Sequence, residues 1–173
     1  MSAPHPFSSW LSNSVRNRRS SLSRFRTSCS IFSGGQFSMS NDGTLNLPGG
    51  TYYITKFTMS GDSTINFSGP TTLYVTGTMS LSGNSQINPS ARPGDLKIRM
   101  PPSSNGISLS NTSRINADIY GDGSLINLSG QSMICGIVLG DSYKLSGTSA
   151  IHVDTSLLGG GGGGGSGSVV LVR

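Results

Sequence analysis

The chain has 173 residues, enough for one domain with a hydrophobic core of its own. Hydrophobic residues make up only 34% of it and charged residues only 11%, which argues against intrinsic disorder, where weak hydrophobicity accompanies high charge. The net charge of +5 comes from an acid-free leader, whereas residues 34–173 contain seven basic and seven acidic residues, so we expect no nucleic-acid partner for the body of the protein.

Residues 1–33 form a basic leader rich in serine and arginine. A disordered tail, a misassigned start and a segment similar to an organelle transit peptide are three interpretations. A cap on a repetitive fold is a fourth, and it rests on a weak apolar pattern formed by Phe7, Trp10, Leu11 and Val15. No apolar run in the chain reaches the roughly 18 residues that span a bilayer, so we expect no membrane span. Cys29 and Cys135 are expected to be unpaired, with Cys135 a small core residue.

An eight-residue pattern recurs six times within residues 34–158. Its order is an apolar residue, Ser, Gly or Asn, a polar residue, a small residue, a variable residue, Ile or Leu, and usually Asn. The copies begin at Met39, Met59, Leu81, Leu109, Leu128 and Leu145. Their spacing of 17 to 28 residues is too short for helical-hairpin repeats and fits one coil of a β-solenoid.

Each copy predicts a half-buried strand, a corner and the start of a second strand. The Gly or Asn supplies the corner because both residues tolerate positive φ. Stacked coils would then align two apolar rows, one made of Met59, Leu81, Leu109, Leu128 and Leu145, and the other of Ile65, Ile87, Ile115, Ile134 and Ile151. The Asn positions that follow the second row predict a ladder of side-chain hydrogen bonds, or alternatively a linear ligand-binding row, formed by Asn46, Asn66, Asn88 and Asn116.

A third apolar segment lies between successive copies and predicts one more strand per coil. The candidates are 52–54, 73–75, 96–98, 118–120 and 137–139. Three short strands and three corners per coil predict an all-β fold, a single-domain right-handed parallel β-helix of about 5–6 coils of roughly 20 residues, as expected for such repeats. The longest insertion, around residues 101–105, fits a loop that bulges from one corner.

The C-terminal part differs in composition from the repeats. Residues 159–168 form a glycine-rich linker, and residues 169–173 predict a terminal strand. That strand would cover the last coil or pair with another molecule, because an open solenoid end exposes a sheet edge.

Candidate catalytic groups are few. Gly140–Ser142 resembles the start of a hydrolase block, with His152 and Asp154 downstream, but a repeated Gly-Asp, also present at Gly121–Asp122, is better explained by a corner turn. Asp122 and Asp141 would lie on neighbouring coils and form the best carboxylate pair for polysaccharide cleavage. We expect no catalytic residue, no cofactor and no metal site, because there is no glutamate and the seven aspartates are dispersed.

Three weaker surface features each have a functional interpretation and a simpler one in which the side chains are only solvated. Asp42 and Asp62 align at a turn, where weak calcium binding competes with simple solvation. A small basic patch, which is more simply a solvated strand face, would consist of Lys97, Arg99 and Arg114. An ice-binding face would use Thr58, Thr76 and Thr78, but no Thr-x-Thr row repeats from coil to coil.

Residues 48–158 resemble a domain of unknown function found in bacterial envelope proteins, often beside PilX-like or Tad-like pilus-assembly segments. The resemblance rests on Pro48–Tyr53, Gly69–Gly77, the serial Leu-Ser-Gly copies and the closing segment Ile151–Leu157. It implies an exported β-helical domain with no established activity. The apolar pilin-like helix expected upstream is missing from this sequence. A looser resemblance is to bactofilin-like cytoskeletal polymers, whose coils are usually more regular.

The leading hypothesis is a non-catalytic structural or adhesive β-solenoid of the bacterial cell envelope or the extracellular space, with envelope or pilus proteins as partners. The first alternative is a filament-forming β-helix that self-associates through the solenoid ends. The others are a carbohydrate-binding or carbohydrate-active β-helix and an ice-binding solenoid.

Overall fold

Three parallel sheet faces enclose one core in the computed structural model, which describes residues 35–153. Face 1 consists of β1 (Gln36–Met39), β4 (Lys56–Met59), β7 (Thr78–Leu81), β10 (Gly106–Leu109) and the later parts of β12 (Asp118–Leu128) and β14 (Val138–Leu145). Face 2 consists of β2 (Gly43–Leu47), β5 (Ser63–Phe67), β8 (Gln86–Ile87), β11 (Arg114–Asn116), β13 (Met133–Cys135) and β15 (Ala150–His152). Face 3 consists of β3 (Gly50–Ile54), β6 (Thr71–Val75), β9 (Leu96–Met100) and the first parts of β12 and β14.

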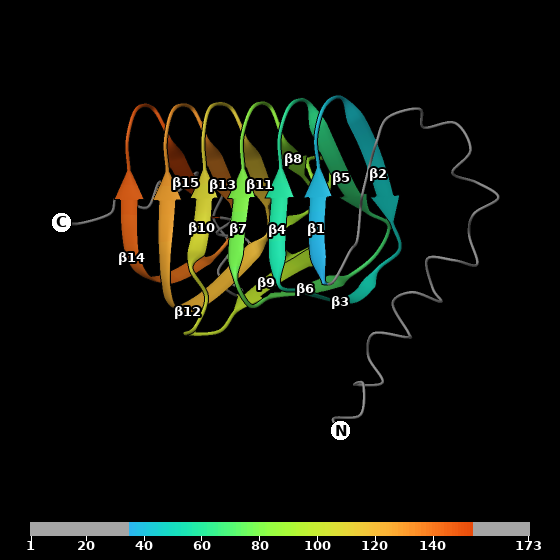
Figure 1. Ribbon diagram of the computed structural model, residues 1–173, viewed down its shortest axis with the longest axis horizontal. Helices are drawn as coiled ribbons and strands as arrows, with labels where there is room; N and C mark the ends of the chain where they lie inside the picture. Colours follow the sequence, from blue (N-terminus) through green and yellow to red (C-terminus); the bar gives the residue numbers. More distant parts are fainter. Residues whose placement is uncertain (1–34, 154–173) are drawn as a thin grey trace, which may run out of the picture.

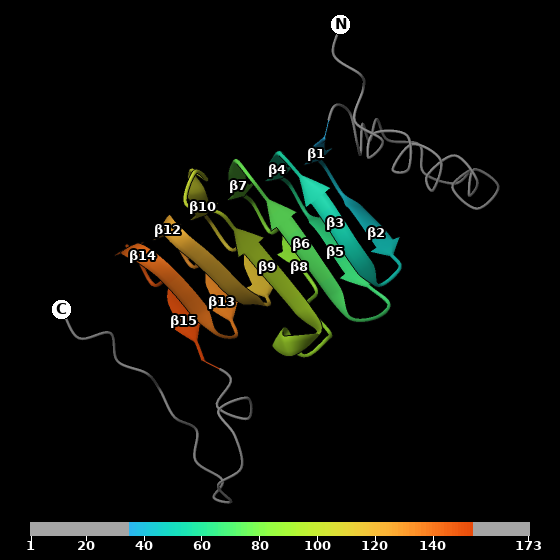
Figure 2. The same cartoon turned by 90° about the horizontal axis from the view of Figure 1, so that it is seen from below.

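The chain winds through these faces as a right-handed β-solenoid of about six coils, which confirms the predicted fold class. In Figure 1, β1 rises at the front, the chain crosses the top to descend behind as β2, and each later coil lies further left. Figure 2 shows the strands of face 3 side by side along the solenoid axis. β12 and β14 run around the corner between faces 3 and 1, so these two faces form one nine-stranded sheet.

Both predicted apolar rows are present. Met59 pairs with Leu81, and the row continues in register through Leu109 and Leu128 to Leu145. The isoleucine row runs from Ile65 to Ile151 in the same way. Burial of such rows is the main stabilising contribution, at about 25 cal/mol per Å² of apolar surface removed from water. Leu145, in the last described strand of face 1, is 40% exposed.

The corner between faces 1 and 2 repeats the same backbone conformation in all six coils, and we call it the repeat corner. The predicted positive φ is found at Asn41, Gly61, Gly83, Asn111, Gly130 and Gly147, with values of 59° to 73°. Two residues later in each coil stands a small residue, serine in five coils. The hydroxyl of Ser113 donates to the carbonyl of Ser110 at 2.8 Å, and equivalent bonds close the corners at Ser63, Ser85 and Ser149.

The predicted asparagine ladder was wrong beyond its first pair. Asn66 Nδ2 donates to Asn46 Oδ1 at 3.0 Å, as expected. Asn88 instead adopts a φ of 57° at the start of an insertion, and its buried Nδ2 has no hydrogen-bond partner. Asn116 Nδ2 consequently donates to the carbonyl of Pro89, 3.1 Å away.

The longest coil contains two insertions rather than one. Residues 89–95 leave face 2 and end in a 3-10 helix, η1 (Pro93–Asp95), while residues 101–105 form a loop between faces 3 and 1. The second loop lies where the bulge was predicted, but 89–95 is the longer insertion, and its helical turn was not expected from the sequence. The leader 1–33, the linker 159–168 and the terminal strand 169–173 lie outside the described residues.

Candidate functional site

Face 3 alternates between inward and outward side chains, and its outward row is unlike the small polar surface elsewhere. Inward residues such as Leu73, Ile98 and Ile119 are buried in the core. The register places five outward residues side by side on successive coils, and we call them the outer row: Tyr53, Tyr74, Arg99, Tyr120 and Leu139. Three of them are large exposed hydrophobic side chains, with Tyr53 at 52%, Tyr74 at 38% and Leu139 at 55%.

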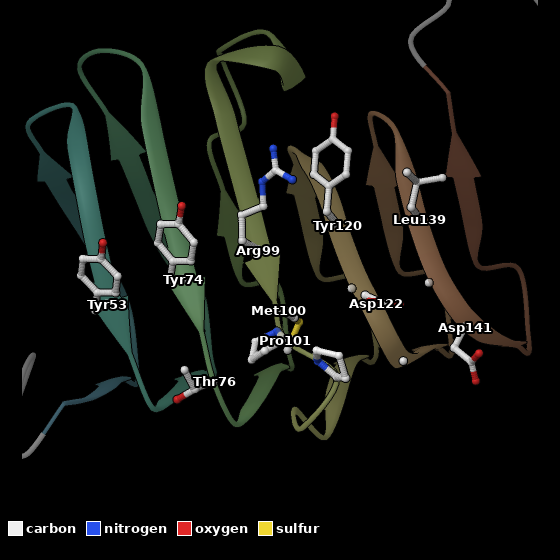
Figure 3. Close-up of a pocket in the computed structure, with 14 residues that line it drawn as sticks. Tyr53, Tyr74, Thr76, Arg99, Met100, Pro101, Tyr120, Asp122, Leu139 and Asp141 are labelled. Carbon is white, nitrogen blue, oxygen red and sulfur yellow. The ribbon is translucent and has the colours of Figure 1, made fainter.

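The outer row is ordered by contacts between its own members. The rings of Tyr53 and Tyr74 stack with centroids 5.0 Å apart and planes 8° apart. The guanidinium carbon of Arg99 lies 4.0 Å from the ring centroid of Tyr120, in a cation–π contact. Figure 3 shows these side chains in a single line across the strands, with Arg99 between Tyr74 and Tyr120. The row therefore forms a continuous strip rather than scattered exposed aromatics.

A groove of about 790 Å³ lies along this strip, beside the corner between faces 3 and 1, which we call the groove corner. The outer row lines one side. The other side and the end come from Thr76, Met100, Pro101, Pro102, Gly121, Asp122, Gly123, Gly140 and Asp141. Gly123 has a φ of 68°, and a Cβ there would meet the Cα of Pro102 at 3.2 Å, so the bend of β12 next to the proline loop requires glycine.

The proline loop is anchored to the coils on both sides of it. The buried hydroxyls of Ser104 and Ser124 share a hydrogen bond of 2.6 Å, which ties the loop to β12. The backbone N–H of Asn105 donates to the carbonyl of Gly77 at 3.2 Å, and its side-chain amide donates to Thr78 Oγ1 at 3.3 Å. Because hydrogen bonds fix it on both sides, the loop forms a preformed wall of the groove.

The charges of the groove are asymmetric. Its charged lining residues, among those described, are Arg99 in the outer row and the exposed carboxylates of Asp122 and Asp141 at the groove corner. Gly121 pairs with Gly140, so the two aspartates directly after them lie on neighbouring coils, as the sequence predicted. One cation and two anions give this surface a net negative charge, with hydrogen-bond donors and acceptors at opposite sides.

The hydrolase constellation considered from the sequence is not assembled by the described residues. Ser142 lies on β14 and pairs with Leu125 of β12. His152 lies on β15 in face 2 and pairs with Cys135 of β13. His152 follows the isoleucine row at the position that Asn46 and Asn66 occupy in earlier coils, as expected. Asp154 lies outside the described residues.

The other surface predictions met different outcomes. Lys97 and Arg99 share β9, but Arg114 lies on β11 of face 2, so the three exposed residues do not form one basic patch, and solvated strand faces remain the simpler interpretation. Thr58 pairs with Ser80 rather than with Thr78, and this register aligns no row of the three threonines.

Asp42 and Asp62 do occupy equivalent corner positions, just before the paired residues Gly43 and Ser63. Asp62 accepts a hydrogen bond of 2.8 Å from the amide of Asn84 on the next coil. Residues 35–153 contain no group of three or more acidic, histidine or cysteine side chains placed to hold a metal ion.

Cys135 is half-buried and outward-facing, so its prediction as a core residue was wrong. It pairs with Asn116 and His152 in the row next to the isoleucines. Partial burial raises the pKa of the Cys135 thiol, and the nearby charge of Arg114 offsets part of that increase. This combination does not describe an activated thiol, whose pKa is lowered.

The sequence held one signal that would have revealed the outer row. In 52–54, 73–75 and 96–98 an outward residue lies between two inward ones, as in Leu73-Tyr74-Val75, whereas 118–120 and 137–139 have the inward residue at the centre and an outward residue at the end. The predicted strand 96–98 is two residues shorter than β9, because the alternation of inward and outward residues continues to Met100. This extension places Arg99 beside Tyr74. Aligning the outward positions after that extension gives the strip.

The fold defines a repeat protein of the β-solenoid class, and the groove makes face 3 chemically distinct from the other two faces. Residues 61–159, more than half of the chain, match the model of a family described as Domain of unknown function (DUF7305), and the chain belongs to this family. Neither the search of curated proteins nor that of solved structures gave a match. Within residues 35–153, no helix is both long and apolar enough to span a membrane.

Proposed function

We propose that this protein is a non-catalytic, adhesive β-solenoid of the bacterial cell envelope, which binds its ligand through the groove on face 3. The observation that supports this most strongly is the outer row. A contiguous surface with several large exposed aromatic and aliphatic side chains commonly marks an interaction site, and this row runs beside a preformed wall. The envelope location and the pilus association rest on the sequence resemblance alone.

The absence of catalysis is part of the same proposal. Asp122 and Asp141 converge on the groove, which makes glycoside hydrolysis the one enzymatic reading with an observation in its favour. Both carboxylates are exposed, however, whereas a glycosidase needs a general acid whose surroundings favour the protonated form. Rigid presentation of a binding strip is the simpler use of these residues.

A sedimentation assay tests the adhesive role. The full chain is mixed with purified bacterial envelope fragments, and the bound fraction is compared between the wild type and the double variant Tyr74→Ala/Tyr120→Ala. The matched control changes two outward residues of face 1, Thr58→Ala/Ser108→Ala. We expect the wild type and the control to sediment with the fragments and the face 3 variant to stay in solution.

Two results would overturn the proposal. One is a wild-type protein that does not sediment with any envelope preparation. The other is sedimentation that persists unchanged in the face 3 variant, because binding would then use another surface. Electron microscopy of the same samples distinguishes adhesion from self-assembly, since end-to-end filaments of the pure protein would favour the filament alternative.

A further inference from the structure

We propose that the ligand of the groove is an uncharged, extended polysaccharide lying along the solenoid axis, with one sugar unit over each coil of the outer row. This inference rests on the proposed binding function and names its substrate class. Four properties of the groove support it: its repeat length, its surface chemistry, its charge and the pairing of the strands beneath it.

The repeat length is set by the fold. Successive coils are separated by the spacing of neighbouring strands, about 4.8 Å, so the five residues of the outer row span about 19 Å. This spacing is close to the length of one sugar unit in an extended chain. A polymer of sugars aligned with the axis would therefore meet an equivalent position of the protein at each unit, as a linear repeat surface allows.

The surface chemistry suits a ligand with apolar patches and hydroxyl groups on the same unit. Tyr74 and Tyr120 present aromatic surface to the C–H groups of a sugar ring. Arg99 donates hydrogen bonds, and the exposed carboxylates of Asp122 and Asp141 accept them from hydroxyls. Because Arg99 lies on the Tyr120 ring, its fork of donors is already oriented before a ligand arrives.

The charge of the groove disfavours an acidic polymer. The two aspartates outnumber the single arginine, so a polyanion such as an acidic polysaccharide or a nucleic acid meets net repulsion at the groove corner. Nucleic-acid surfaces also need several cations to neutralise phosphates, and this groove supplies one.

The sheet beneath the row disfavours an extended peptide. β9 is hydrogen-bonded to β6 on one side and to β12 on the other, so its backbone groups are already paired. A peptide cannot add as a further strand at the centre of a sheet. The remaining peptide mode, a proline-rich helix docked on aromatic rings, is kept as an outcome of the experiment.

Calorimetric titration of the full chain tests the inference. The probes are neutral β-linked gluco-oligosaccharides from the trisaccharide to the hexasaccharide, the acidic polymer polygalacturonate, and a proline-rich peptide. We expect binding of the neutral series, with an affinity that rises to the pentasaccharide and then levels off, because the row covers five coils. Polygalacturonate and the peptide should give no signal at the same concentrations.

Variants assign the binding to the outer row. Tyr74→Ala should weaken pentasaccharide binding by about tenfold, as loss of one aromatic contact implies. Tyr74→Phe should retain most of the affinity, and Thr58→Ala on face 1 should retain all of it. If Tyr74→Ala fails to fold by circular dichroism, Tyr120→Ala provides the same test one contact further along the row.

The outcomes separate the two proposals. If the neutral glycans do not bind while the envelope sedimentation still depends on Tyr74 and Tyr120, the substrate class is wrong and the adhesive function stands. Binding of the peptide instead would likewise overturn the glycan assignment. Equal binding of polygalacturonate would overturn the charge argument. A wild-type protein that binds neither the glycans nor the envelope fragments would overturn both proposals.

Discussion

The repeat corner and the groove corner are built on the same coils, but they differ in how far the coils resemble one another. At the repeat corner, all six coils place Asn or Gly at positive φ, and five place serine two residues later. At the groove corner, the length and path of the backbone differ between coils, as in the proline loop 101–105 and the bend between Gly121 and Leu125.

The difference shows which constraints come from stacking. At the repeat corner, the Cβ of a residue replacing Gly61 would lie 3.0 Å from the backbone of Asn41 on the preceding coil. Such close approach leaves little choice of residue or conformation. The side chains of the outer row point away from the core and contact one another only at the surface, so close backbone stacking does not determine their identity, and they remain free to serve binding.

The largest expected effect contrasts the core with the outer row. Ile115 is fully buried between Ile87 and Ile134, and Ile115→Ala should lower the free energy of unfolding by about 2–5 kcal/mol through the lost burial and the cavity left behind. Tyr74→Ala should cost only about 1 kcal/mol, because the ring is already partly exposed. Urea unfolding of both variants measures the difference, and equal losses would contradict the division into core and binding residues.

The second effect concerns backbone conformation at the repeat corner. Gly61 has a φ of 72°, so Gly61→Ala should cost about 1–2 kcal/mol. Gly61→Asn is the matched variant, because Asn41 and Asn111 hold the same corner at similar φ. Both substitutions add the same Cβ, so a smaller loss for asparagine isolates the contribution of φ. Equal losses in thermal unfolding would assign the whole cost to crowding against Asn41.

The third effect compares two buried serines at equivalent corners. Ser113 donates to Ser110 at 2.8 Å, and Ser113→Ala should cost about 1 kcal/mol through the lost hydrogen bond. The buried hydroxyl of Ser132 has no partner, so Ser132→Ala should be neutral or slightly stabilising. Unfolding measurements on the two variants test this directly, and a loss at Ser132 as large as that at Ser113 would be inconsistent with an unpaired hydroxyl.

Sequence reasoning succeeded where the fold repeats itself. The alignment of Met59 with Leu81 and the positive φ at Gly83 follow from the local pattern, because each coil must satisfy the same packing. The same logic failed at Asn88, where the insertion 89–95 begins and the coil no longer continues as its neighbours do. A local pattern cannot indicate where an inserted segment changes the conformation of its first residue.

The candidate site was harder to predict because its members share position but not identity. Tyr74 and Arg99 are 25 residues apart, with η1 and its preceding loop between them, and only the strand register brings them together. The aspartates of the groove corner were predictable, since Gly121–Asp122 and Gly140–Asp141 repeat a recognisable dipeptide. The sequence predicted the loop 101–105 as a bulge but not its role as a wall of the groove, because its position depends on the hydrogen bond between Ser104 and Ser124.

The smallest expected effect concerns the pKa of Cys135, which lies in the outward row of face 2. This row adjoins the repeat corner, but its residues vary between coils. The pKa of the Cys135 thiol is raised by partial burial, and Arg114 opposes that increase. In a Cys29→Ser background, thiolate absorbance should therefore titrate above the ordinary range for cysteine, and higher still in Arg114→Gln. A titration at or below the ordinary value would place Cys135 in a more solvated position than the structure does.

The sign of the linked stability effect follows from the same shift. Because the folded pKa lies above the unfolded one, the unfolded state releases its thiol proton first as the pH rises. The free energy of unfolding should then fall between the two pKa values and level off above the folded one. Cys135→Ser in the same background removes this dependence, so the difference between the two stability curves isolates the contribution of the thiol. A difference that grows in the opposite direction would mean that folding favours the thiolate, and would reassign the dominant influence on Cys135 from burial to Arg114.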